Sequence, residues 1–330
     1  MWRPIGRMYE IPSQLMRGPF TVEHSRKLGL PRGVLVRRFV RLHPRVWCHP
    51  DHVLDFDDRV LAAALALPDR AKLTGISRIQ RLGLDFGPRT PIRFVIRGDH
   101  HLALDGIFLH RTKRLPPYDE HGVMPAAAFI AYCSLARVVD AIKVGDWLLR
   151  NGHLTVESVR ALALRELWRA GAQEAVWILG YLDGRSRSLP ESETRAILEF
   201  AGLPRPGLNV ALDDGPEPQV IVDLRYERWG LVVEYEGSQH QEDRGQYVID
   251  IGRYSWMRRH QVPYVQVTKE KLRHPRTLAG EVYSALVALG YHGPPPEFGD
   301  RWLLLFGSIS NALGPRQRRA ALPARRTAVS

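Results

Sequence analysis

The chain has 330 residues, enough for roughly two or three domains of ordinary size. Its hydrophobic fraction of 45% and charged fraction of 25% are those of globular proteins, which excludes a disordered or fibrous chain. A formal net charge of +12 indicates a polyanionic partner, most often nucleic acid. Since nearly all of the positive charge comes from arginine, the bias of a GC-rich genome is an equally good explanation of the basicity.

The cysteines and the hydropathy pattern bear on the compartment. Cys48 and Cys133 are too few and too far apart for a disulfide framework or a thiolate zinc site, which favours a reducing environment. Residues 1–17 lack the apolar core of a signal peptide, and no later stretch approaches the ~20 apolar residues of a membrane helix. We therefore expect a cytoplasmic protein without a membrane partner.

Residues 1–52 have the order of a winged helix-turn-helix. The pattern predicts helices at 11–17, 21–28 and 31–38, followed by extended pieces at 39–42 and 45–49. Thr21 is placed to cap the second helix, and Pro31 fits the first turn of the third, where a missing N–H has no consequence.

Five arginines of this unit are suited to contact the phosphates of DNA. They lie on the third predicted helix and on the wing that follows it, and they are Arg32, Arg37, Arg38, Arg41 and Arg45. We expect this unit to bind DNA. The alternative is a protein-contact module, a use that small winged-helix units also have.

Residues 53–184 are predicted to be a mostly helical α+β region without a chemical motif. Helices are expected at 57–67, 77–84, 126–141, 144–150 and 155–163, and strands at 92–97 and 107–111. Trp147, Trp168 and Trp177 fall at helical spacings, which predicts positions in the core. We interpret this region as one that connects and packs.

Residues 185–292 show the pattern of an α/β domain with acids inside its strands. A helix capped by Ser188 or Ser192 is expected to reach Phe200, and two apolar β runs follow at 220–224 and 231–237. A helix at 243–260, a strand at 262–268 and a helix at 277–289 complete an αββαβα unit with a mixed central sheet. Residues 293–330 are expected to hold one short packed element and a basic, disordered tail.

The two β runs carry Asp223 and Glu234, and pairing as a hairpin brings these acids together on one face. Glu236 shares the face of Glu234, because side chains alternate along a strand. Acids within apolar strands are unfavourable unless a cation or hydrogen bonds compensate them. Carboxylates suit Mg²⁺ or Mn²⁺, and His240 follows closely enough to act on a water or a scissile phosphate.

The motifs of this domain occur in a defined order: Glu191 after Ser188-Leu189-Pro190, Val222-Asp223, Val233-Glu234-Tyr235-Glu236-Gly237 with His240, Asp250 with Arg253, and Val265-Gln266-Val267-Thr268. Together they resemble the Vsr-like branch of the PD-(D/E)XK nucleases, many of whose bacterial members have a strand reading Glu-x-Asp-Gly-x-x-His. The upstream region resembles, more loosely, an AbiEi-antitoxin-like winged helix. The resemblance implies a restriction-endonuclease-like α/β domain that cleaves DNA with Mg²⁺ or Mn²⁺.

The resemblance also implies roles for individual residues. Asp223 and Glu234 would bind the metal, His240 would be the general base or orient the water, and Glu191 would be an acidic helix residue near the metal. Asp250 and Arg253 would support the site. Two residues depart from the pattern: Glu236 is one methylene longer than the usual Asp, and Gln266 stands where relatives often carry Arg. Either departure would shift the metal or weaken the binding of phosphate.

Each of these residues also has a structural interpretation. Asp223 and Glu234 would then be surface acids paired with Arg225 or Arg228, and Glu236 a solvated strand end. His240 would be structural, and Asp250 with Arg253 an ordinary ion pair on a helix surface.

Three function classes follow from the sequence. The first is a metal-dependent DNA endonuclease. The second is a DNA-binding or antitoxin-like regulator whose nuclease fold has lost turnover, and the third is an interaction protein that does not bind DNA.

Overall fold

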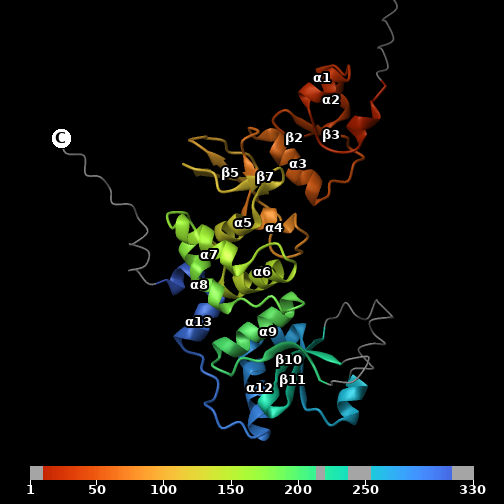
Figure 1. The fold of residues 1–330 in the computed structure, drawn as a ribbon. Helices are drawn as coiled ribbons and strands as arrows, with labels where there is room; N and C mark the ends of the chain where they lie inside the picture. Colours follow the sequence, from red (N-terminus) through yellow and green to blue (C-terminus); the bar gives the residue numbers. More distant parts are fainter. Residues whose placement is uncertain (1–9, 213–219, 237–253, 314–330) are drawn as a thin grey trace, which may run out of the picture. The chain divides into compact units, whose positions relative to one another are not determined.

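The structure of the protein is a computed structural model, which describes residues 10–212, 220–236 and 254–313 (Figure 1). The chain is a mixed α/β protein that divides into two compact units, residues 1–128 and 129–330. The predicted middle region, 53–184, is thus shared between the two units. None of the helices in the described ranges is long and apolar enough to cross a membrane.

The first unit opens with short helices and a small antiparallel sheet. Its elements are η1 (Ser13–Met16), β1 (Phe20–Thr21), α1 (Val22–Lys27), α2 (Arg32–Arg38), β2 (Val40–His43) and β3 (Val46–Cys48). The strand order is β1-β3-β2. The Thr21 side chain caps α1 as predicted, since it accepts a hydrogen bond from the His24 amide. The helix predicted at 11–17 is only the 3-10 turn η1, and Leu15 is its buried residue.

The first unit also contains a second sheet, two helices and a short pair of strands. The elements are α3 (Phe56–Ala66), β4 (Lys72–Leu73), α4 (Gly75–Gln80), β5 (Ile92–Arg97), β6 (Ile107–Thr112), β7 (Tyr118–Asp119) and β8 (Gly122–Val123). The sheet order is β4-β5-β6, with β4 and β5 antiparallel and β5 and β6 parallel. Its apolar face packs on α3, where Val60 and Ala63 meet Ile92 and Phe94. The helix predicted at 57–67 and the two strands are confirmed.

The helices that follow differ from the prediction at one point. The predicted helix 126–141 is two helices, α5 (Pro125–Cys133) and α6 (Val138–Arg150). Arg137 is extended and forms a β-bridge with Ser308, and the Ala136 carbonyl accepts a hydrogen bond from the Ile309 amide. This pairing with a distant segment breaks the helix, although its apolar periodicity is continuous.

Further helices of the second unit are α7 (Val156–Arg165), α8 (Ala172–Ile178) and η2 (Leu179–Tyr181). Thr155 caps α7 through a capping box with Ser158. Trp168 was expected in the core but its exposed fraction is 47%. The reason is local, because α7 ends at Arg165 and Trp168 lies in the turn that follows.

A four-stranded mixed sheet carries the predicted nuclease-like region. Its elements are α9 (Leu189–Phe200), β9 (Gly207–Ala211), β10 (Ile221–Tyr226), η3 (Glu227–Trp229), β11 (Leu231–Glu236), β12 (Tyr264–Thr268), α11 (Lys269–Leu272) and α12 (Pro275–Ala288). The order is β12-β11-β10-β9; only β11 and β12 are parallel. Figure 1 shows α9 and α12 against this sheet, and residues 254–259 are helical, with Met257 packed near Val232.

Strand β9 was missed from the sequence, so the predicted αββαβα order lacks one strand. Its five residues, Gly-Leu-Asn-Val-Ala, include Asn209 in a left-handed conformation with φ 49°, and only Leu208 is buried. The chain closes with α13 (Asp300–Phe306), the predicted short packed element, and α14 (Ile309–Ala312). The predicted basic tail lies outside the described residues.

Candidate active site

The predicted hairpin is confirmed, and it brings Asp223 and Glu234 together. Strands β10 and β11 are antiparallel with Leu224 opposite Val233, so the next pair along the hairpin is Asp223 and Glu234. Gly230, with φ 68°, makes the turn after η3. The left-handed conformation favours glycine at this position, because a Cβ is unfavourable there. A local turn therefore sets the register that aligns the two acids.

Hydrogen bonds cross between the two strands at this pair. The Asp223 amide donates to Oε1 of Glu234 at 2.9 Å, and the Tyr235 amide donates to Oδ2 of Asp223 at 2.9 Å. Each carboxylate is thus held by the main chain of the opposite strand. The exposed fraction of Glu234 is 0%. Because backbone donors stabilise a carboxylate, this arrangement fixes both acids, Glu234 in a buried position and Asp223 in a partly buried one.

Asp223 and Glu234 belong to a row of polar residues that crosses the sheet, with one residue on each of the four strands. Glu234 pairs with Gln266 of β12. On the other side, Leu208 and Val210 pair with Leu224 and Val222, which places Asn209 beside Asp223. The row therefore runs from Asn209 through Asp223 and Glu234 to Gln266. Asn209 was not predicted to matter; the only signal in the sequence was a polar residue between two apolar ones.

Glu236 lies at the exposed end of β11, on the same side as Glu234. Its carboxylate accepts a hydrogen bond from Nε2 of Gln266. Glu236 and Gln266 thus contact each other. The Gln266 amide therefore orients the Glu236 carboxylate through a neutral hydrogen bond. An arginine at position 266 would orient it through an ion pair.

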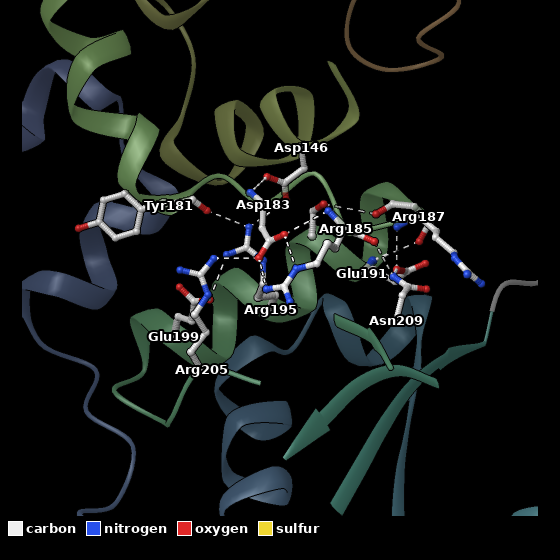
Figure 2. A network of polar contacts seen from close by, with 12 residues as sticks. Asp146, Tyr181, Asp183, Arg185, Arg187, Glu191, Arg195, Glu199, Arg205 and Asn209 are labelled. Atoms are coloured by element: carbon white, nitrogen blue, oxygen red, sulfur yellow. Dashed lines mark hydrogen bonds and ion pairs between the residues drawn. The ribbon is translucent and has the colours of Figure 1, made fainter. Parts of the chain in front are cut away.

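Glu191 is buried in the first turn of α9, with an exposed fraction of 5%. The Ser188 side chain caps this helix as expected. Oε2 of Glu191 accepts hydrogen bonds from the Arg187 amide at 2.8 Å and from Nδ2 of Asn209 at 2.9 Å (Figure 2). Glu191 therefore ties the start of α9 to β9, at the residue beside Asp223.

Three predicted site residues, His240, Asp250 and Arg253, lie outside the described residues. Within the described ranges, no three side chains of the His, Cys, Asp and Glu types form a group that could hold a metal ion. Asp223 and Glu234 supply two oxygen donors of the kind that Mg²⁺ and Mn²⁺ prefer.

The alternative partners of these acids are engaged elsewhere. Nη1 of Arg225 donates to the Ala211 carbonyl at 3.1 Å, and the Arg228 guanidinium lies over the Trp229 ring, 5.4 Å from its centroid. The interpretation of Asp223 and Glu234 as surface acids fits poorly with these contacts and with the burial of Glu234.

The arginines predicted to contact DNA lie in the first unit, and all of them are exposed. Three are on α2, one is on β2, and one is in the turn before β3; they are Arg32, Arg37, Arg38, Arg41 and Arg45. The hairpin and α2 hold them around one core, in which Leu35 and Phe39 are buried. Each of the five arginine side chains is thus accessible at the surface of this unit.

A buried ionic network links α9 to α6 and η2, and the sequence analysis missed it. The Arg195 guanidinium, with an exposed fraction of 0%, donates to Asp146 at 2.8 Å, to the Tyr181 carbonyl at 2.9 Å and to Glu199 at 3.0 Å (Figure 2). Asp146 also accepts from the Asp183 amide at 2.6 Å. The signal was present, because Asp146 stands within the apolar run of α6, as Asp223 does within β10.

Burial and hydrogen bonding shift the pKa values of two acids in this network in opposite directions. Burial raises the pKa of Asp146 to about 6, although Arg195 opposes the shift. For Asp183, burial acts to raise the pKa, but hydrogen bonds and the charge of Arg185 outweigh it and hold the pKa at about 2. The network joins α6, η2 and α9, so it fixes the helix that carries Glu191.

No protein-family model matches the chain, and no curated protein matches it.

Proposed function

We propose that the protein is a metal-dependent nuclease that hydrolyses phosphodiester bonds in DNA, with its site on β10 and β11 and a restriction-endonuclease-like domain around it. The observation that carries the proposal is the pair Asp223 and Glu234, which stand side by side on the two central strands, one of them fully buried. Two adjacent carboxylates repel each other, and burial increases that repulsion. A divalent cation compensates both charges.

The donor set fits such a cation. Each carboxylate accepts a hydrogen bond from a main-chain amide, and we assign the carboxylates of Asp223 and Glu234 as metal ligands. A bound Mg²⁺ or Mn²⁺ lowers the pKa of a coordinated water and stabilises charge on the phosphate. The protein contributes the fixed position of the carboxylates, because the opposite strands hold them. His240 remains the predicted general base.

Glu236 and Gln266 occupy the place where this kind of nuclease has a shorter acid and a cation. Their mutual hydrogen bond holds the longer Glu236 side chain at the edge of the site. We propose that Glu236 orients the attacking water rather than binding the metal, since it is exposed and already bonded to Gln266. This assignment predicts that Glu236→Gln lowers the turnover number more than it weakens metal binding.

The test is cleavage of supercoiled plasmid and of mismatched duplex with Mg²⁺ or Mn²⁺. Asp223→Asn and Glu234→Gln are expected to abolish cleavage, because they remove the ligand charge but keep an oxygen that accepts the amide hydrogen bond. Glu227→Gln is the matched control, since Glu227 is an exposed acid at the other end of the same hairpin. Cleavage by the Asp223→Asn protein at the wild-type rate would refute the catalytic proposal.

A second candidate function is that of a duplex-DNA-binding regulator. The exposed arginines on α2 and the β2–β3 hairpin favour it, because helices and wings of this kind place arginines on phosphates. In this case the Arg37→Gln/Arg38→Gln protein loses duplex affinity and Asp223→Asn leaves it unchanged. Binding without cleavage under any metal would favour the regulator.

A further inference from the structure

The sheet β4-β5-β6 has an apolar face and an opposite face on which basic and aromatic side chains surround the buried Val95. The apolar face packs on α3. On the other side Arg93 is the register partner of Phe108, and Val95 lies between Lys72 and His110. Arg97 follows at the end of β5. Since side chains alternate along a strand, these residues share the face that α3 does not cover.

Large aromatic rings are exposed on and beside this face. The exposed fractions are 46% for Phe108 and 53% for Tyr118. The Arg93 guanidinium lies 5.0 Å from the Phe108 ring centroid, and Nζ of Lys72 lies 5.0 Å from that of Tyr118. Each ring is thus paired with a cation. A single exposed ring is ordinary on a protein surface, but two exposed rings that each lie beside a cation form a mixed aromatic and basic surface.

The charge on this face has one sign. Lys72, Arg93 and Arg97 are its charged residues, and within the described part of the chain none of them forms an ion pair. Burial lowers the pKa of Arg93. A cluster of uncompensated cations attracts a polyanion. Rings beside such cations fit unpaired bases, because bases stack on aromatic rings and on guanidinium planes while phosphates contact the cations.

We propose that this face binds single-stranded nucleic acid, with bases stacked on Phe108 and Tyr118 and phosphates on Lys72, Arg93 and Arg97. The occupant is a single strand because paired bases do not offer their faces to the rings. The proposal goes beyond the nuclease function, since it uses neither the carboxylates of β10 and β11 nor the arginines of α2. A strand held here gives the protein a second contact with a frayed, nicked or mismatched substrate.

Fluorescence anisotropy tests the proposal with the full-length protein in EDTA, so that cleavage plays no part. The probes are labelled oligothymidylate and oligouridylate of roughly 16 nucleotides, and a duplex of the same length. Phe108→Ala is expected to weaken binding of a single strand by about tenfold or more, the effect of removing one base stack, and to leave duplex binding unchanged. Phe108→Tyr restores the affinity, because it keeps the ring. The two probes show whether a deoxyribose or a ribose strand binds better.

The matched control is Trp168→Ala. Trp168 is another exposed aromatic residue with an arginine, Arg169, over its ring, but Arg169 is paired with Glu166. This control is expected to bind single strands as the wild type does. Lys72→Gln and Arg97→Gln are each expected to lower the salt dependence of log K by about 0.7, because each variant neutralises one phosphate fewer.

Several results would overturn the proposal. One is wild-type binding of both single strands by Phe108→Ala, another is no binding of either strand by the wild type, and a third is equal loss of single-strand and duplex affinity. Thermal unfolding of each variant checks the fold. Because Phe108 is nearly half exposed, its loss is expected to leave the melting temperature unchanged.

Discussion

Replacing Arg195 by methionine is expected to destabilise the second unit by about 3 to 5 kcal/mol. The guanidinium is fully buried and donates to two carboxylates and one carbonyl. Methionine fills a similar volume but leaves Asp146 buried without its cation, while Glu199 keeps its contact with Arg205. Removal of one partner from a buried ion pair has this magnitude. The loss is therefore expected to be several times that of an exposed pair.

Equilibrium unfolding in urea, followed by tryptophan fluorescence, measures the effect. Arg205→Met is the matched control, because Arg205 contacts Asp183 and Glu199 but its side chain is 44% exposed. Exposed ion pairs contribute about 0 to 1 kcal/mol, so this control is expected to change little. A double variant, Arg195→Met with Asp146→Leu, is expected to recover most of the stability, since it removes the orphaned charge as well.

The effect is also expected to depend on pH. Burial raises the pKa of Asp146 to about 6, and loss of Arg195 raises it further, so the carboxyl binds a proton more readily in the folded variant. A raised acid pKa means that the folded state gains stability as pH falls, and the deficit is smaller near about pH 5 than near about pH 7.5. A deficit below about 1 kcal/mol at neutral pH would refute the assignment of Arg195 as a buried ionic anchor.

Three further predictions concern separate parts of the chain. Asp183→Asn is expected to lower the free energy of unfolding by about 2 kcal/mol at neutral pH, because the pKa of Asp183 is about 2 in the folded state and 3.8 ordinarily. The difference from the wild type is expected to disappear as the pH falls from about 4 to about 2, and urea titrations at each pH measure it. Asn209→Ala is expected to be less stable than Asn209→Gly by about 1 kcal/mol in the same assay, since the residue has φ 49° and both variants lose its hydrogen bonds. Arg37→Gln/Arg38→Gln is expected to lower the slope of log K against log salt for duplex by about 0.9 for each phosphate that is no longer neutralised, and equal slopes would remove α2 from the DNA surface.

The sequence predicted the hairpin of β10 and β11 and the meeting of Asp223 with Glu234, because an acid within each apolar strand is a local signal. It also predicted α1, α3 and the cap at Thr21, where the capping residue and the apolar spacing lie within one turn. These features depend on near neighbours along the chain.

What the sequence could not predict depends on partners that are distant in the chain. Helices α5 and α6 are separate because Ala136 and Arg137 pair with the segment around Ser308. The strand β9 was missed because its residues have a weak β pattern of their own, and pairing with β10 stabilises it as a strand. Arg195 was missed because three separate segments supply its acceptors.

The central claim is that Asp223 and Glu234 bind a metal ion. Crystals of the protein grown with Mn²⁺, examined by anomalous diffraction, test it most directly. We predict a peak within coordination distance, about 2.1 Å, of the carboxylates of Asp223 and Glu234, which disappears in Asp223→Asn. A wild-type map without density at this position at saturating Mn²⁺, or an equal peak in the Asp223→Asn protein, would contradict the claim.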